Sequence, residues 1–198
     1  MTGAVTRQHS IVKRYRALAA TSGAHGPKRE LLLDGVHLLA EAHASGLIID
    51  TAAFEHTALK QPQTRALAER LTAAGTEVLI VSGNVLEAMS PVKTPSGVVG
   101  IARHSLVTLR DALGRSPALV VVAHDIQDPG NVGALLRTAE AAGATAFVAC
   151  GATADPLGWK ALRGSMGSAM RVPVARAEIQ ETLQACREIG IPVTALAP

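Results

Sequence analysis

Short runs of apolar residues alternate along this chain with longer segments in which apolar residues recur every three or four positions. The first pattern is typical of buried strands and the second of amphipathic helices, so the chain predicts an α/β fold. We predict strands at residues 30–33, 47–53, 77–81, 97–102, 118–123, 145–150, 171–174 and 191–196. Helices are predicted at residues 8–20, 35–44, 63–74, 84–89, 131–142, 157–163 and 177–188.

A turn-rich segment divides these elements into two groups. We predict a first domain at residues 1–105, a linker at 106–117 and a second domain at 118–198. In the second group, short connections predict a parallel sheet with right-handed crossovers and helices on both faces. Because open parallel sheets bind ligands at the carboxyl ends of their strands, we expect the functional site at that edge.

The net charge of +3 is unevenly distributed. Residues 1–30 carry six Lys and Arg side chains against a single Glu, so this end is strongly basic while the rest is slightly acidic. Such an end is a candidate phosphate-binding arm, and a solubilising terminus is the alternative. The candidate RNA-binding residues are Lys13, Arg14, Arg16, Lys28 and Arg29.

The remaining composition narrows the class of protein. Aromatic residues make up only 2% of the chain, which excludes a surface on which many bases stack. Cys150 and Cys186 have no metal-ligand spacing, so we expect no metal site and a reducing, cytoplasmic location. No apolar run approaches the roughly 20 residues of a membrane span, and we expect a soluble protein.

The segment at residues 125–144 follows the predicted strand at 118–123 directly and contains the most informative pattern in the chain. Asp128 opens a tight Asp-Pro-Gly turn, and Asn131 is a natural N-cap for the helix that follows. Gly133 allows a neighbouring backbone or a ligand to approach the first helical turn closely. The pattern places a polar turn and a helix start at the carboxyl edge of the sheet.

Arg137 lies in the middle of that helix, and two interpretations of it stay open. Glu140 is three residues further on and could form an ordinary exposed ion pair with it. Alternatively, a guanidinium beside the carboxyl edge of a sheet can hold a phosphate or a developing alkoxide. Spacing alone does not choose between them.

The stretch Asp128-Pro-Gly-Asn-Val-Gly-Ala-Leu-Leu-Arg137-Thr-Ala resembles the first signature motif of the SpoU (TrmH-like) RNA ribose 2′-O-methyltransferases of the SPOUT superfamily. Residues 160–174 resemble the small-residue stretch that precedes a Val-Pro strand in this family. Residues 30–102 resemble the substrate-binding domain of many members, with Asp34 where Glu is usual. The resemblance implies a small α/β/α ribosomal-protein-like domain followed by a SPOUT (α/β knot) parallel-sheet domain.

By this resemblance, we expect methyl transfer from S-adenosylmethionine to a ribose 2′-hydroxyl of ribosomal or transfer RNA, by a homodimer in the cytoplasm. Asn131 and Arg137 match the family's catalytic positions. Because arginine stays protonated, it is a poor base. We therefore expect Arg137 to fix the ribose-phosphate and stabilise the alkoxide, with Asn131 holding the loop and Arg137 in place.

Members of the resembled family continue past the last predicted strand with two further motifs, which form a trefoil knot and most of the cofactor pocket. This chain ends at Pro198 before them. We therefore expect an incomplete second domain, no cofactor-binding residues in this chain, weak binding of S-adenosylmethionine and an unpaired edge at the last strand. The chain would then be a fragment of the enzyme.

Two other classes of function stay open. One alternative is a noncatalytic RNA-binding remnant of the same family. Another is an unrelated nucleotide-binding α/β enzyme that uses the turn at residues 128–133 for phosphate. Of the remaining candidates, Ser165 and Ser168 are best explained by close helix packing, and Trp159 by packing between domains rather than by stacking on a base.

Overall fold

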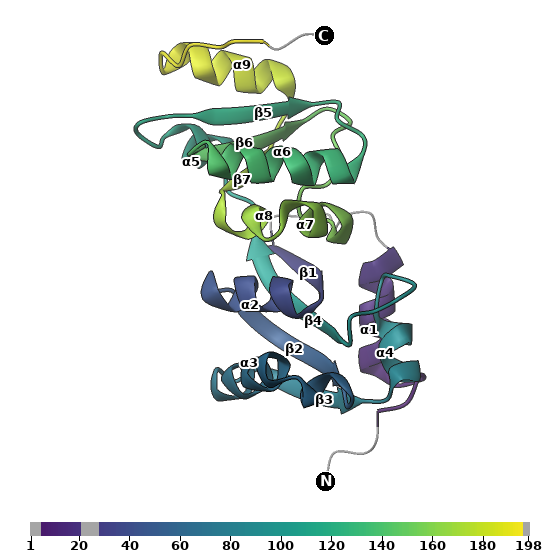
Figure 1. The fold of residues 1–198 in the computed structure, drawn as a ribbon. Helices are drawn as coiled ribbons and strands as arrows, with labels where there is room; N and C mark the ends of the chain where they lie inside the picture. Colours follow the sequence, from purple (N-terminus) through teal and green to yellow (C-terminus); the bar gives the residue numbers. More distant parts are fainter. Residues whose placement is uncertain (1–4, 21–27, 196–198) are drawn as a thin grey trace.

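The structure is a computed structural model that describes residues 5–20 and 28–195. Its strands form two separate sheets, which lie one above the other in Figure 1. The first sheet has four strands from the N-terminal half, and the second has three parallel strands from the C-terminal half. This arrangement confirms the α/β fold class that the alternating patterns predict.

The first sheet is mixed. Its order is β1 (Lys28–Asp34), β4 (Val98–Ser105), β2 (Ile48–Glu55) and β3 (Glu77–Val81). β4 runs antiparallel to both neighbours, whereas β2 and β3 are parallel. One face is covered by α2 (Val36–Ala44) and α3 (Pro62–Ala73), with the short 3-10 helix η1 (Ala58–Lys60) between β2 and α3; the other is covered by α1 (Ser10–Ala20) and α4 (Gly83–Met89).

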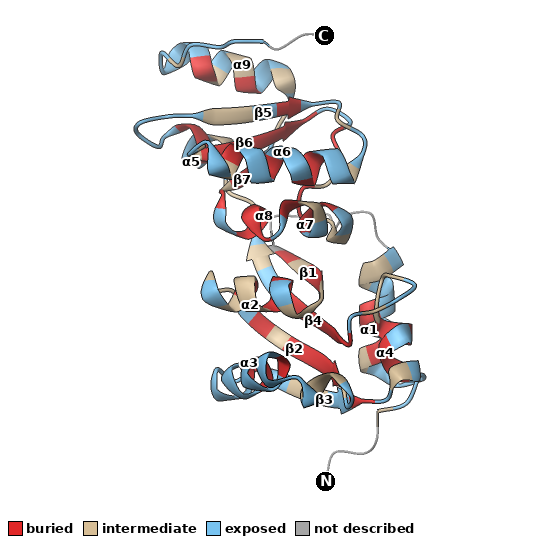
Figure 2. Ribbon diagram, viewed as in Figure 1, coloured by how far each residue is buried: buried red, intermediate tan, exposed pale blue. Residues whose placement is uncertain are grey.

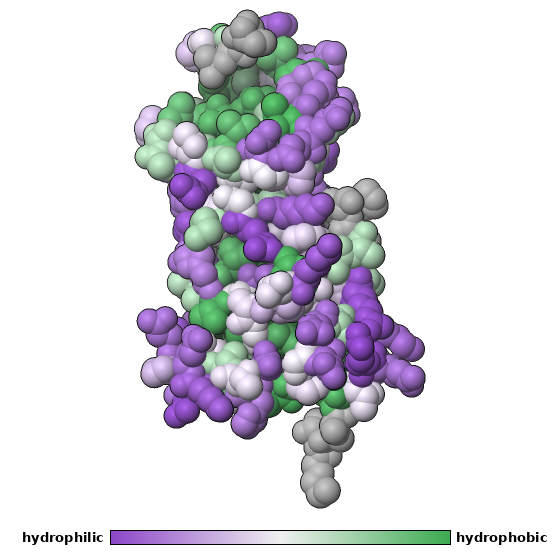
Figure 3. Space-filling model, turned by 45° about the vertical axis from the view of Figure 1, so that its right-hand side comes forward, coloured by the Kyte–Doolittle hydropathy of each residue, from purple (hydrophilic) through white to green (hydrophobic). Residues whose placement is uncertain are grey.

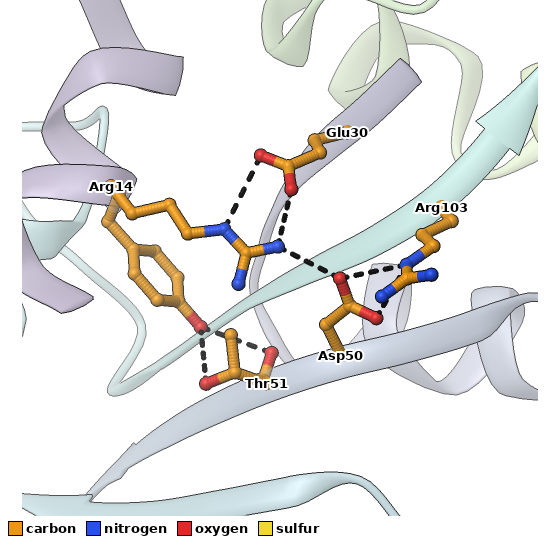
Figure 4. A network of polar contacts seen from close by, with 6 residues as sticks. Arg14, Glu30, Asp50, Thr51 and Arg103 are labelled. Carbon is orange, nitrogen blue, oxygen red and sulfur yellow. Dashed lines mark hydrogen bonds and ion pairs between the residues drawn. The ribbon is translucent and has the colours of Figure 1, made fainter. Parts of the chain in front are cut away.

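The basic helix α1 is fixed to the first sheet by buried side chains. Val12 and Tyr15 are fully buried, and the Tyr15 hydroxyl donates to the Thr51 carbonyl oxygen at 3.1 Å (Figures 2 and 4). Burial raises the pKa of this hydroxyl far above its usual range, so it stays protonated and can donate. The helix is therefore part of the folded first sheet unit.

Ion pairs at the surface add to this attachment. The Arg14 guanidinium of α1 contacts the Glu30 carboxylate on β1 and lies 2.8 Å from the Asp50 carboxylate on β2 (Figure 4). The Asp50 carboxylate also forms an ion pair with Arg103, whose Nε lies 2.8 Å from Asp50 Oδ1. Burial opposes ionisation of Asp50, but its hydrogen bonds with both arginines outweigh this and lower its pKa.

The second sheet has the order β5 (Val120–His124), β6 (Ala146–Cys150) and β7 (Val174–Arg176). The face toward the first sheet is covered by α6 (Pro129–Ala141), α7 (Trp159–Ser165) and α8 (Ser168–Arg171), and the opposite face by α5 (Leu109–Leu113) and α9 (Ile179–Glu188). Phe147 of β6 packs into the first layer and Val148 into the second, as the alternation of a strand requires.

Two predicted strands of the C-terminal half differ from the structure, and the predicted linker contains a helix. The predicted linker contains α5, whose N-cap Thr108 accepts a hydrogen bond from the Asp111 backbone N–H, so polar residues typical of turns serve here as a cap. The strand predicted at 171–174 is displaced: β7 covers Val174–Arg176. Arg171 ends α8, and the next two residues connect this helix to the strand. Residues 191–195 form no strand, and the last three residues lie outside the described part.

The unpaired sheet edge is expected at the strand predicted for residues 191–196, but the described residues there form no strand. The edge strands are β5 and β7. Pro192 cannot donate to a ladder, and Val193 is 55% exposed rather than packed on a neighbour. The apolar run at 191–196 resembled a strand only locally.

One buried core continues from the first sheet into the second. It contains Leu33 and Phe54 from the first sheet together with Leu136 and Phe147 from the second half; buried segments of both halves are red in Figure 2. α7 lies between the two, against β1 on one side and α6 on the other. The two sheets are therefore packed together rather than loosely tethered.

Glycines allow α6 and α7 to cross at backbone contact. A Cβ atom at Gly133 would lie 2.5 Å from the Ala161 carbonyl oxygen and 2.8 Å from the Ser165 backbone nitrogen. Gly164 meets Gly133 from the other side of the same contact. The expectation that Gly133 admits a neighbouring backbone is confirmed, and the buried Ser165 confirms the close-packing interpretation of the small residues.

We predict that Gly133→Ala lowers the free energy of unfolding by about 1–3 kcal/mol, because the added methyl group must displace the backbone of α7. Gly83→Ala is the matched control, since its Cβ would meet only the carboxylate end of Glu55. Urea unfolding followed by circular dichroism measures both. An equal, small effect for the two variants would contradict the backbone contact.

Candidate functional site

Two loops meet at the carboxyl edge of the second sheet. They are the β5–α6 loop, residues 125–128, and the β6–α7 loop, residues 151–158. The buried Thr153 hydroxyl lies 3.0 Å from the Ala123 carbonyl oxygen and 2.6 Å from the Cys150 carbonyl oxygen, at the ends of both strands. It also accepts a hydrogen bond from Ile126 N–H at 3.3 Å. One hydroxyl therefore joins both strand ends to both loops.

Asp125 fastens the same loops from the exposed side. Its carboxylate accepts a hydrogen bond from the Ala152 backbone N–H at 2.7 Å, and its own backbone has a φ of 57°. An aspartate tolerates this left-handed conformation better than most residues. Sequence reasoning missed the roles of Asp125 and Thr153, because their partners lie in a loop more than twenty residues away.

The N-cap of α6 is Asp128 and not Asn131. The Asp128 carboxylate accepts a hydrogen bond from the Asn131 backbone N–H at 2.8 Å, and Pro129 occupies the first turn, where its missing N–H costs nothing. The expectation that Asn131 caps the helix is therefore wrong. Its exposed side chain makes no hydrogen bond with any residue that the structure describes.

Arg137 is exposed on α6, and its expected partner is engaged elsewhere. Glu140 binds Arg171, whose Nη2 lies 2.8 Å from a Glu140 carboxylate oxygen, and the hydrogen bond from Arg171 lowers the pKa of that carboxyl. Within the described ranges, Arg137 forms no ion pair or hydrogen bond. The interpretation of Arg137 as half of an i, i+3 ion pair is therefore wrong.

Asn131 and Arg137 are both exposed on α6, but their side chains do not contact each other through a hydrogen bond. Six residues separate them, which corresponds to about 9 Å along the helix axis and about 120° around it. The structure records no hydrogen bond between the two side chains. The loop is held by Asp125, Asp128 and Thr153, so the expectation that Asn131 holds the loop and Arg137 in place is wrong.

The five basic candidates fall into different environments. Lys13 and Arg16 are exposed on α1, with Arg16 Nε donating to the Ala88 carbonyl oxygen at 3.1 Å. Arg14 is partly buried in the ion pairs described above. Arg29 is buried and bound to Asp155, so its guanidinium is not part of the accessible surface. The side chain of Lys28 lies outside the described part of the chain.

The pair of Arg29 and Asp155 joins the two sheet units beside the candidate site. Arg29 Nη1 on β1 lies 2.5 Å from Asp155 Oδ1 in the β6–α7 loop, and the two side chains are only 7% and 9% exposed. Two further ion pairs cross the same boundary: Arg163 with Asp34 and Arg171 with Glu41. No local pattern in the sequence could have paired residues so far apart.

Asp34 is the most buried acid at this boundary, with a side chain 6% exposed at the end of β1. Burial raises its pKa; the hydrogen bond from the Ser90 hydroxyl at 3.0 Å and Arg163 at 3.9 Å oppose this shift only in part. Folding therefore holds a carboxyl group in a place that disfavours its charged form.

A pocket of about 530 Å³ lies between the end of α1, the β5–α6 loop and the start of α7. Its walls include Ala20, Gln127, Pro129, Asp155, Trp159 and Lys160. Trp159 packs against the core beneath α1 and α4, as expected of a residue that packs between domains, and the part of it that stays exposed lines the pocket. A second pocket of about 470 Å³ lies between α5 and α9, on the far face of the second sheet.

The surface differs between the two units. Polar side chains dominate the lower part of Figure 3, over the first sheet unit, and apolar side chains gather in its upper part, over the second sheet.

Cys150 and Cys186 are buried and form no disulfide, as expected of small apolar residues. Among the described residues there is no acidic, His or Cys cluster able to hold a metal ion, and no helix long and apolar enough to cross a membrane.

Comparison with known proteins gives two family matches that together span most of the chain. Residues 118–198 match the SpoU rRNA Methylase family, and residues 10–100 match the MRM3-like substrate binding domain. A solved rRNA methyltransferase from Sinorhizobium meliloti has a TM-score of 0.78 and 31% identity, with 92% of this chain and 67% of that chain covered. Its AdoMet-bound form gives a TM-score of 0.76, 30% identity and coverage of 93% and 67%.

Curated relatives agree with these matches. An uncharacterized tRNA/rRNA methyltransferase of Synechocystis is 38% identical over 170 residues, which are 84% of this chain and 59% of that protein. A 23S rRNA guanosine 2′-O-methyltransferase of Bacillus subtilis is 29% identical over 165 residues, covering 82% of this chain and 60% of its own length. The chain thus spans about three fifths of the length of these relatives.

We predict that Asp155→Asn lowers the free energy of unfolding by about 3–5 kcal/mol, because it leaves the buried Arg29 charge without its counterion. Arg103→Ala is the control: it breaks an ion pair whose arginine is 65% exposed and should cost at most about 1 kcal/mol. Urea unfolding measures both. Similar losses for the two variants would argue against a special role of the buried pair.

We also predict that Asp34→Asn flattens the pH dependence of stability. Since the folded-state pKa of Asp34 is raised, the wild type loses stability relative to this variant as pH rises from about 4 through that raised pKa. The asparagine keeps an oxygen that can accept from Ser90. Urea unfolding of both proteins across this range provides the measurement, and parallel stability curves would exclude the effect.

Proposed function

Because this chain belongs to the SpoU rRNA methylase family, we propose that it acts in methyl transfer from S-adenosylmethionine to a ribose 2′-hydroxyl of ribosomal or transfer RNA. The observation that carries the proposal is the strand–turn–helix at the carboxyl edge of the second sheet. There, Asp128 caps α6 and Gly133 contacts the backbone of α7. The side chains of Asn131 and Arg137 are exposed and make no hydrogen bond or ion pair with the described residues. Side chains that the fold does not use are available to a substrate.

Two kinds of relative support this proposal. The Bacillus subtilis relative is named for 2′-O-methylation of 23S rRNA, and the Sinorhizobium meliloti relative was solved with AdoMet bound. We propose that residues 1–105 form the RNA-recognition domain and residues 118–198 the methyltransferase domain, as the two separate sheets favour. We further propose that the protein works in the cytoplasm as a homodimer, by analogy with the family.

The proposed catalytic residues are Arg137 and Asn131. The methyl group would pass from the sulfonium sulfur to the ribose oxygen, so the S–C bond breaks and S-adenosylhomocysteine leaves, while the hydroxyl proton passes to solvent. As that proton leaves ahead of the new C–O bond, negative charge develops on the oxygen. The Arg137 guanidinium is permanently protonated and exposed, so it can stabilise this charge and hold the adjacent phosphate through its paired N–H groups. Asn131, one turn and a half earlier on α6, can donate to or accept from the ribose.

The polar groups near the carboxyl edge of the second sheet have partners within the described residues. None of their buried side-chain polar atoms lacks a hydrogen-bond partner. The polar groups at the carboxyl edge are satisfied by the two loops themselves. We propose no cofactor-binding residue here, and the roles proposed above concern the RNA alone.

We propose that Lys13 and Arg16 are the RNA-binding residues of α1, since both are exposed on a helix fixed to the sheet. Arg14 contributes its charge from within an ion-pair network, and Lys28 remains a candidate by position. Arg29 is withdrawn from this set because it is buried against Asp155. The basic arm is thus smaller than the sequence indicates.

We predict that, in the complete enzyme, Arg137→Ala reduces methyl transfer by at least about 100-fold while leaving the unfolding midpoint unchanged, because the side chain contributes to charge stabilisation but not to packing. Transfer of a labelled methyl group to ribosomal RNA measures the activity. Arg70→Ala, at another exposed helical arginine, is the control and should be fully active. Normal turnover by the Arg137 variant would refute the assigned role.

A further inference from the structure

The pocket between α1 and α7 contains an aromatic ring that the proposed chemistry does not use. Trp159 is the single tryptophan of the chain and is partly exposed, whereas both Phe side chains and the single Tyr are fully buried. The volume of about 530 Å³ falls within the range of pockets that bind small organic groups. It is therefore large enough for one nucleobase with its sugar.

Lys160 lies over the ring of Trp159. Its Nζ atom is 5.4 Å from the ring centroid, in a cation–π contact at an exposed side chain. Such a contact is weak, and stacking of a base on an aromatic ring is commonly stronger. A base can therefore take the place of the ammonium group over the ring, and the long lysine side chain can turn toward a phosphate.

The charges around the pocket favour an anionic ligand. Among the described residues of its wall, Asp155 is the only acid, and the buried pair with Arg29 neutralises this carboxylate. Lys160 is left as the exposed charge of the wall. On α1, Lys13 and Arg16 lie on the same helix face as Ala20, which forms part of the wall. A line of positive charge therefore leads along α1 into the pocket.

We propose that this pocket holds one unpaired base of the RNA, stacked on Trp159, with Lys160 bound to a neighbouring phosphate. The inference rests on the proposed function and extends it by a binding site for a second nucleotide. Pro129 in the wall and Arg137 are eight residues apart on α6, about 12 Å along its axis. Asn131 is only two residues from Pro129, about 3 Å along the axis, so we place the stacked base on a nucleotide next to the methylated one.

The single tryptophan allows a direct test by intrinsic fluorescence. An RNA hairpin with an unpaired loop is titrated into the protein, and a fully paired RNA duplex of the same length serves as the comparison. We expect the hairpin to quench Trp159 emission and to shield it from acrylamide, and the duplex to bind more weakly with little quenching. An unchanged emission in the presence of saturating hairpin would overturn the pocket assignment.

Variants separate the pocket from general attraction to RNA. Lys160→Ala is at an exposed position and should weaken hairpin binding about 5- to 10-fold, with a shallower salt dependence equivalent to about one phosphate contact. Trp159→Leu should weaken it about 10-fold and abolish the preference for the hairpin over the duplex, whereas Trp159→Phe should keep that preference. Lys60 is an exposed lysine on η1 that does not line the pocket, so the Lys60→Ala variant should bind the hairpin with wild-type affinity.

The outcomes distinguish this inference from the function on which it rests. Hairpin binding at wild-type affinity by both the Lys160 and Trp159 variants would refute the pocket but leave RNA methylation standing. Failure of the wild-type protein to bind either RNA would refute both. A loss of affinity in the Lys60 variant equal to that of the Lys160 variant would show nonspecific attraction and would also refute the pocket.

Discussion

The buried ion pair between Arg29 and Asp155 is the constraint on which the arrangement of the two sheets depends. Both groups lie out of water, so neither can leave its partner without exposing an uncompensated charge to an apolar environment. Arg29 belongs to β1 and Asp155 to the loop that carries the site, so the pair fixes the first sheet relative to the second. The shared core supplies the attraction between the units, and the pair supplies their register.

Within that frame, the signature motif divides its residues between structure and chemistry. Asp128 ends the loop and begins α6, and Gly133 lets α7 approach to backbone contact. Asn131 and Arg137 project from the same helix, and their exposed side chains contribute neither to its cap nor to its packing. Conventional rules of capping and packing account for Asp128 and Gly133, whereas the role of Asn131 and Arg137 is the proposed contact with a substrate. The motif thus combines a helix-packing element with a surface for recognition.

The sequence was sufficient for the elements whose causes are local. The continuous apolar run at residues 145–150 predicts β6, which is buried along its whole length, and the helical period at residues 8–20 predicts α1, which begins two residues later. Residues 191–195 were misassigned because a strand needs a neighbour that a local pattern does not reveal. Asp128 and Asn131 are equally good capping residues, and only the start of α6 decides between them. The ion pairs between the units depend entirely on tertiary geometry.

Tyr15 illustrates how a core residue can influence the kinetics of recognition. Its ring and hydroxyl hold α1 in the folded first sheet unit, so the cations of this helix are arranged before any ligand arrives. A basic segment that folded only on contact would lose chain entropy at that moment and bind more weakly for the same contacts. For α1 that loss has already occurred during folding of the protein. Encounter with the proposed RNA ligand would then be limited by diffusion and electrostatic steering, and not by the ordering of α1.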